Sequence, residues 1–328
     1  ALRRADEGAA HAEQARGDRA LHRLGSAAVG EAGADGGRGE TVLHQRHQAR
    51  VERGGLRRGR IAPGEVEVDH LRERQLADEV AGQEQFDFAT EFSFRLTVNV
   101  IFEFVGLHEV ADREKFILML EDAFAIDPEI GADRDQLAGA TSQQYAEAEA
   151  LVRDVVRARA ASPTDDLISK MIDPGTGLTE DDAVALTLSM VLVCVRTTAA
   201  SLDNMVDYLA GHTDLRDELI DDPSLIPAAV EEMLRYFAVT PLVARTLIQD
   251  TELGGVELHA GDRIAAVLAL ANLDEDQFPD PDEIDTDRND GMHLTFGLGT
   301  HYCLGLWLAR MELRTALEGL LERIPSYE

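Results

Sequence analysis

The chain has 328 residues, 45% of them apolar, with a formal net charge of −31 and two cysteines, Cys194 and Cys303. That length suits one large domain or two ordinary ones, and the apolar content is ample for a buried core. The acidic balance argues against a nucleic-acid-binding protein and against adhesion to an anionic membrane. The scarcity of cysteine argues against a disulfide framework and fits a reducing cytoplasm.

Residues 1–69 lack the pattern of a folded domain. They contain no aromatic residue, since the first one in the chain is Phe86, and runs such as GEAGADGGRGE mix glycine with charge. Such a segment cannot bury enough apolar surface to offset its ordering entropy, so we expect it to be poorly structured. The N-terminus lacks the apolar core of a signal peptide, and no stretch has 18 uncharged apolar residues, which predicts a protein outside the membrane.

Helical periodicity begins near His70. A first helix is predicted in residues 71–83, and residues 86–107 are apolar enough for one or two buried helices. Two amphipathic helices are predicted over 112–126 and 142–161, separated by the Asp, Pro and Gly of AIDPEIGADRDQ.

The longest apolar helix is predicted between Thr179 and Gly211. Thr179 and Asp182 have the spacing of a capping box, and Gly211 is a typical stop. The run between them is apolar on nearly every face, which indicates a helix through the middle of a protein. Arg196 and Asp203 within it argue against a membrane span.

A pair of oppositely charged residues and a set of short β-prone runs precede the C-terminal region. Glu232 and Arg235 lie one helical turn apart and are able to pair, a spacing that is also common on solvated helix surfaces. Residues 241–274 then contain short β-prone runs, broken by two glycines and by HAGD, which predict hairpin strands.

Residues 296–305, FGLGTHYCLG, place Cys303 where a loop becomes a helix. Gly297 and Gly299 permit backbone angles closed to other residues and let the chain approach a flat ligand closely. Apolar residues then recur at helical spacing: Leu304, Trp307, Leu308, Met311 and Ala316. A helix N-terminus favours a thiolate, which can serve as a nucleophile or a soft metal ligand, whereas a lone cysteine is more often a small buried hydrophobe.

This stretch resembles the haem-binding loop of the cytochrome P-450 family, F-G-x-G-x-H-x-C-x-G. The matching residues are Phe296, Gly297, Gly299, His301, Cys303 and Gly305. The resemblance implies a mainly α fold with a small β portion and haem b (iron protoporphyrin IX) as cofactor. Cys303 would be the axial thiolate on the iron, and His301 would reach a haem propionate.

The resemblance extends over residues 70–328 and implies further roles. Glu232, Arg235 and Arg288 would form a charged structural triad, and Arg245 would bind a propionate. The family's N-terminal strands, the helix that carries its other propionate ligands and its final hairpin are not found, so we expect an incomplete version of the fold.

Residues 193–198 align with the family's distal motif A-G-x-(Asp or Glu)-Thr-Thr, and they depart from it. Thr197 and Thr198 match, and Thr197 would face bound oxygen. Arg196 replaces the acid that helps to deliver protons, which resembles the fatty-acid peroxygenase branch. The alternative is an Arg196 that points sideways to a carboxylate and has no chemical role.

The function implied is a haem-thiolate monooxygenase that inserts one oxygen atom from dioxygen into a small apolar substrate in the cytoplasm. Electrons would come from a ferredoxin and its reductase or from a flavin reductase. A peroxide-using haem-thiolate enzyme and an inactive haem-binding remnant are the alternatives. A cysteine hydrolase is disfavoured, because no Asp or Asn partner for His301 can be placed.

Overall fold

The computed structural model describes residues 75–124, 134–288 and 293–327, and these form two compact units. One unit holds the described residues of 75–230 and 304–327, and the other is Glu231–Cys303 without 289–292. The predicted poorly structured segment, residues 1–69, lies outside the described residues.

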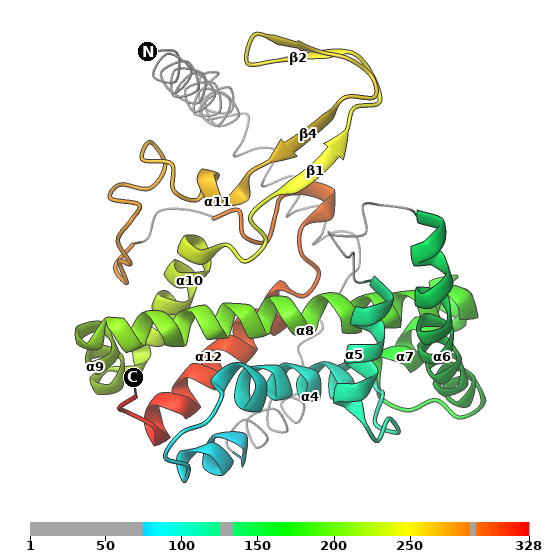
Figure 1. The fold of residues 1–328 in the computed structure, drawn as a ribbon, viewed down its shortest axis with the longest axis horizontal. Helices are drawn as coiled ribbons and strands as arrows, with labels where there is room; N and C mark the ends of the chain where they lie inside the picture. The colour runs from blue at the N-terminus through cyan, green and yellow to red at the C-terminus, as the bar shows by residue number, and fades with distance from the viewer. Residues whose placement is uncertain (1–74, 125–133, 289–292, 328) are drawn as a thin grey trace, which may run out of the picture. The chain divides into compact units, whose positions relative to one another are not determined.

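Helix α8 (Glu180–Gly211) is the centre of the first unit. It begins with a capping box, in which the Thr179 hydroxyl accepts from the Asp182 N–H while the Asp182 carboxylate accepts from the Thr179 N–H. It packs against α4 (Phe94–Val105), α6 (Arg134–Ala161) and α12 (Leu306–Arg323) (Figure 1). The predicted long apolar helix, with its capping box and its end at Gly211, is thereby confirmed.

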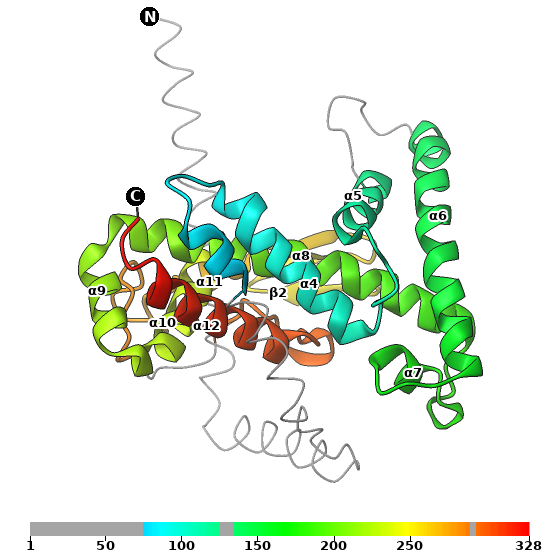
Figure 2. The ribbon, with the colours of Figure 1, turned by 90° about the horizontal axis from the view of Figure 1, so that it is seen from below.

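Helix α8 is also long and apolar enough to cross a membrane, the one helix of the described residues with that property. Its neighbours on several sides identify it as the core helix of this unit. Figure 2 shows α4 and α12 along the same side of α8, with α6 near the end opposite α9.

This unit contains further helical segments. They are a helix over residues 75–81, the π-helical turn η1 (Ala89–Ser93), α5 (Arg113–Phe124), α7 (Leu167–Met171), η2 (Pro174–Thr176), α9 (Thr213–Asp221) and η3 (Pro223–Leu225). Helix α4 ends at Gly106, whose φ of +96° is in the left-handed region that favours glycine.

The second unit is entered through α10 (Ile226–Phe237) and carries two antiparallel ladders. Strand β1 (Val243–Thr246) pairs with β4 (Arg263–Ala266), and β2 (Thr251–Leu253) pairs with β3 (Val256–Leu258). The turn between β2 and β3 is Gly254–Gly255, and both have positive φ, as a tight two-residue hairpin requires. The predicted hairpin strands are confirmed.

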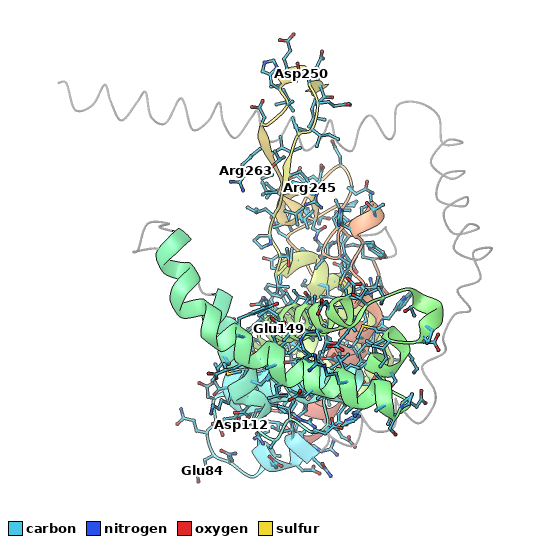
Figure 3. All side chains as sticks on the ribbon, turned by 90° about the vertical axis from the view of Figure 1, so that its right-hand side faces the viewer. Glu84, Asp112, Glu149, Arg245, Asp250 and Arg263 are labelled. Atoms are coloured by element: carbon cyan, nitrogen blue, oxygen red, sulfur yellow. The ribbon has the colours of Figure 1, made fainter. Side chains whose placement is uncertain are left out.

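Figure 3 shows Arg245 and Arg263 on the two paired strands β1 and β4. Further along the chain lie α11 (Leu268–Ala271) and the 3₁₀ turn η4 (Gly299–His301), which leads to Cys303.

Candidate functional site

The Cys303 loop is closed by its own backbone. The Cys303 N–H donates to the Phe296 carbonyl at 2.9 Å, and the Gly297 N–H donates to the Leu294 carbonyl at 2.8 Å. Gly297 and Gly299 have φ of +71° and +76°, so a side chain at either position would be strained. These bonds fix the cysteine backbone directly opposite Phe296.

Helix α12 begins after the cysteine, with Gly305 as its N-cap and Leu306 as its first residue. Cys303 therefore precedes the helix by three residues and is half-buried. Neither Cys194 nor Cys303 forms a disulfide.

Apolar side chains flank Cys303 in sequence and are uncovered. Leu298 is 66% exposed, Leu304 83% and Trp307 72%. Leu304 and Trp307, which belong to the apolar pattern predicted for this helix, therefore lie outside the core. The buried residues of α12 are instead Leu306, Leu308, Glu312, Leu313, Ala316, Leu317, Gly319, Leu320 and Leu321.

The two glycines of the loop are not crowded by neighbouring atoms. A Cβ added to Gly299 would meet no atom within 4 Å, and one added to Gly297 would meet only the His301 carbonyl, at 3.7 Å. A cysteine outside any disulfide, open space beside Gly299 and uncovered apolar side chains are features that a haem site requires. The residues present therefore fit that group.

The side chains of His301 and Arg245, the two residues predicted to bind the haem propionates, are both exposed. His301 ends the turn η4, and Arg245 lies on β1, where it donates to the Ala244 carbonyl at 2.8 Å. Within the described residues, no hydrogen bond or ion pair joins these two side chains.

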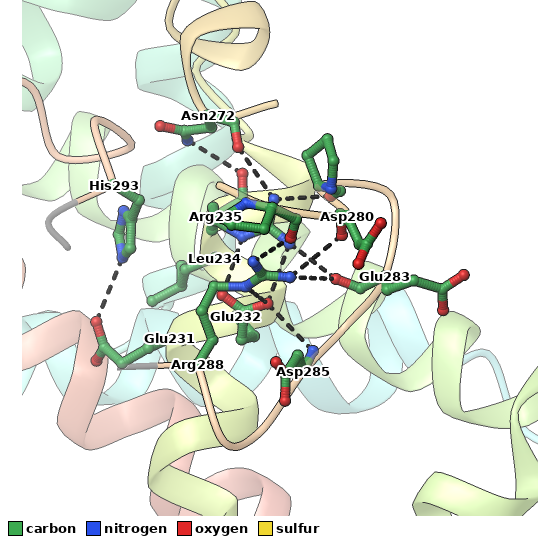
Figure 4. Close-up of polar contacts among 12 residues, drawn as sticks. Glu231, Glu232, Leu234, Arg235, Asn272, Asp280, Glu283, Asp285, Arg288 and His293 are labelled. Atoms are coloured by element: carbon green, nitrogen blue, oxygen red, sulfur yellow. Dashed lines mark hydrogen bonds and ion pairs between the residues drawn. The ribbon is translucent and has the colours of Figure 1, made fainter. Parts of the chain in front are cut away.

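The structure brings together the predicted triad. Arg235 donates two hydrogen bonds to the Glu232 carboxylate, at 2.9 and 3.0 Å, and Arg288 donates a third at 2.9 Å (Figure 4). Arg235 also donates to the carbonyls of Asn272, Pro281 and Glu283. Burial pushes the pKa of Glu232 upward, but the bonds from Arg235 and Arg288 outweigh it and hold that pKa below its ordinary value.

Asn272 belongs to the same cluster and is not predicted from the sequence. Its side chain is fully buried and bonds both to α10 and to the segment that leads into the Cys303 loop. A single Asn within the run ALANLD carries no periodic or spacing signal that marks it.

The predicted distal residues lie in the middle of α8. The Thr197 side chain is exposed and its hydroxyl donates to the Val193 carbonyl at 2.8 Å, while Thr198 is buried. The guanidinium of Arg196 lies over the Phe94 ring of α4, 4.5 Å from its centroid. The Arg196 side chain is therefore engaged with α4.

Asp203 lies two helical turns after Arg196 and accepts a 2.5 Å hydrogen bond from the Ser93 hydroxyl. Burial raises the pKa of the Asp203 carboxyl above its ordinary value, although the Ser93 bond and the charge of Arg196 oppose the rise. Arg196 and Asp203 thus line one contact between α8 and the η1–α4 segment.

Comparison with known proteins finds one family. A sequence profile of the family described as Cytochrome P450 matches residues 141–324. The chain is 35% identical over 272 residues to the mycinamicin IV hydroxylase/epoxidase of Micromonospora griseorubida, covering 81% of this chain and 66% of that protein. It is also 35% identical over 255 residues to the steroid C26-monooxygenase of Mycolicibacterium smegmatis, covering 76% of this chain and 63% of that protein.

A solved structure shows the same fold. P450BioI, in complex with an acyl carrier protein ligated to hexadec-9Z-enoic acid, has a TM-score of 0.75 and 31% identity. The match covers 83% of this chain and 70% of that one.

The chain therefore belongs to the cytochrome P450 family. The predicted family and the mainly α fold with a small β portion are confirmed, and haem b is the cofactor of this family. The chain spans about two thirds of the length of the curated relatives it matches, 66% and 63% for the two named above. The predicted domain extent, residues 70–328, and the roles of individual residues stay predictions.

Proposed function

We propose that Cys303 is the thiolate ligand of a haem b and that the protein is a monooxygenase inserting one oxygen atom from dioxygen into a small apolar substrate. The observation that carries the proposal is the closed Cys303 loop with open space beside Gly299. When bound, haem supplies the iron centre for oxygen activation, and thiolate ligation favours O–O cleavage.

His301 and Arg245 are proposed to bind the haem propionates. Both side chains are exposed, so each is available to a carboxylate without first leaving a buried partner. Charge-assisted hydrogen bonds of this kind are about twice as strong as neutral ones.

Glu232, Arg235 and Arg288 are proposed to have a structural role. Glu232 and Arg235 are 5% and 1% exposed, which leaves no surface for a substrate. Because breaking a buried ion pair costs about 3–5 kcal/mol, the triad supports a fixed conformation of the segment before the cysteine.

The Thr197 hydroxyl is proposed to hold a proton on the distal side. Its hydrogen is directed to the Val193 carbonyl, so its oxygen remains able to accept. The contact of Arg196 with Phe94 supports a packing role for that side chain over capture of a substrate carboxylate by a peroxide-using enzyme.

Redox partners and location are inferred from the family and the composition. Electrons are proposed to come from a ferredoxin with its reductase or from a flavin reductase. Two cysteines that form no disulfide and a core helix packed within the protein support the cytoplasm as the location. By their names, the two relatives above act on mycinamicin IV and on a steroid, which supports an apolar substrate.

The test is the absorption spectrum of the haem-reconstituted protein after reduction and exposure to carbon monoxide. A strongly red-shifted Soret band is expected, and it should disappear in Cys303→His while persisting in Cys194→Ser, which removes the other thiol. Failure of the wild-type protein to take up haem, or a band typical of histidine-ligated haem, would contradict the proposal.

A further inference from the structure

We propose that Asn272 is a positioning residue that fixes the Cys303 loop to the end of α10 and so holds the thiolate in place. The inference rests on the proposed role of Cys303. The observation that supports it is the Asn272 side-chain amide, whose hydrogen bonds join two segments that are distant in sequence.

The Asn272 side chain makes three hydrogen bonds in a fully buried site. Its Nδ2 donates to the Arg235 carbonyl at 3.0 Å and to the Thr295 hydroxyl at 2.8 Å, while its Oδ1 accepts from the Leu294 N–H at 2.6 Å. A carboxamide has two donors and an acceptor oxygen, and here both donors and the acceptor are used. Rotating the amide by 180° would set its NH₂ against the Leu294 N–H, so the partners define one orientation.

The α10 end of this link lies at the last turn of the helix, where the Leu234 carbonyl also accepts from the Ala238 N–H at 3.3 Å. Arg235 lies in the last turn of α10, where carbonyl groups lack intrahelical donors. Asn272 supplies a donor to that carbonyl, and the Thr295 hydroxyl donates to the neighbouring Leu234 carbonyl at 2.7 Å. Asn272 and Thr295 therefore supply donors to two carbonyls at the C-terminus of the helix.

The other end of the link is one residue from the closed turn that presents the cysteine. Thr295 directly precedes Phe296, whose carbonyl accepts from the Cys303 N–H. His293 provides a second attachment, with its Nε2 3.3 Å from the Glu231 carboxylate on α10.

Asn272 is in turn held by the buried triad. The Arg235 guanidinium donates to the Asn272 backbone carbonyl at 3.0 Å, while the Asn272 amide donates to the Arg235 backbone carbonyl (Figure 4). This reciprocal pair connects the Glu232–Arg235 ion pair to the cysteine loop through Asn272.

The test compares Asn272→Leu, which keeps the branching at Cγ and removes the hydrogen bonds, with Asn99→Leu, a matched change in α4 of the other unit. In a Cys194→Ser background, iodoacetamide alkylation reports on Cys303 alone. We expect Asn272→Leu to raise the alkylation rate of the folded apoprotein at least fivefold. After haem reconstitution, we expect it to convert much of the red-shifted carbon monoxide band to the unshifted band. Asn99→Leu should change neither.

A second pair of variants keeps the inference testable if Asn272→Leu fails to fold. Thr295→Val removes the hydroxyl that joins Asn272 to Leu234, whereas Thr295→Ser keeps it. We expect Thr295→Val to raise the alkylation rate and to reduce the red-shifted band, each by less than Asn272→Leu does. Thr295→Ser should match the wild type in both measurements.

Two outcomes would overturn the inference. One is a folded Asn272→Leu or Thr295→Val protein with wild-type alkylation and a wild-type spectrum. The other is an equal effect of Asn99→Leu, which would indicate general destabilisation. A wild-type protein without the red-shifted band contradicts the proposed haem ligation instead, and the alkylation comparison then still decides whether Asn272 holds the loop.

Discussion

Arg196 is a residue at which the contacts of the side chain bear directly on its proposed role. Its guanidinium lies over the Phe94 ring, and its charge acts on the half-buried Asp203. A cation over an aromatic face contributes about 0.5–1 kcal/mol at an exposed site and about 2 kcal/mol when desolvated. Arg196 is exposed, so the lower part of that range applies.

A double-mutant cycle with Arg196→Met and Phe94→Leu tests this packing role. We expect a coupling of about 0.5–1 kcal/mol in the free energy of unfolding, measured with urea. Peroxide-driven turnover of the haem-loaded Arg196→Met protein should equal that of the wild type within twofold. Arg157→Met, which removes an exposed Arg elsewhere, is the control. Additive stability effects together with loss of peroxide turnover in Arg196→Met alone would favour the peroxide-using enzyme.

At the scale of elements, Asp166 joins three helices. It is the N-cap of α7, accepting from the Ser169 N–H at 2.7 Å, and it pairs with the buried Arg159 of α6. Arg159 donates as well to the Gly106 carbonyl at the end of α4. A Cβ on Gly106 would lie 2.5 Å from the Asp166 carboxylate, so this junction needs glycine for space as well as for its backbone angle.

The pH dependence of stability follows from that junction. Burial pushes the pKa of Asp166 upward, but the bonds from Arg159, Ser169 and Thr164 prevail and lower it to about 2. A folded-state pKa below the unfolded value means that the stabilisation is complete above about pH 5 and is lost as the pH falls toward 2.

We therefore expect Asp166→Asn to lower the free energy of unfolding by about 2 kcal/mol at pH 7. Urea titrations at pH 7, 5, 4 and 3 should show the gap to the wild type narrowing below pH 5. Asp165→Asn changes the adjacent carboxylate, whose side chain is 86% exposed, and should leave stability within 0.5 kcal/mol of the wild type. A gap that stays constant with pH would contradict this assignment.

Elements encoded by local spacing were predictable from the sequence. The Thr179–Asp182 box, the Gly254–Gly255 turn and the Glu232–Arg235 pair each involve residues within three positions of one another. Asn272 could not be predicted, because its partners lie 22 to 37 residues away and no period marks them.

Which apolar residues at the start of α12 are buried could not be predicted from the sequence either. Leu304 and Trp307 have the apolar character of core positions, yet both are uncovered. Helical spacing predicts that an apolar face exists but cannot distinguish a core neighbour from a ligand or partner that covers the same face.

At the scale of the whole molecule, charge is distributed very unevenly. Residues 1–80 hold 14 Arg and 14 acidic residues, so the entire charge of −31 arises from residues 81–328. Ion pairs among the described residues, such as Arg153 with Glu149, Glu180 and Asp181, neutralise part of it. Such an excess of one sign opposes the compact state through self-repulsion.

Added salt should therefore stabilise this protein. The Debye length falls from about 14 Å at 50 mM to about 4 Å at 0.5 M, which screens the repulsion between distant carboxylates, while the buried Glu232 cluster is affected little. We expect the unfolding midpoint at pH 7 to rise by about 3–8 °C between these NaCl concentrations, and KCl to have the same effect as NaCl because the mechanism is screening. At pH 4, where many carboxylates are protonated, the rise should shrink. A midpoint that falls with salt would show that surface ion pairs such as Arg153–Glu180 outweigh the net repulsion.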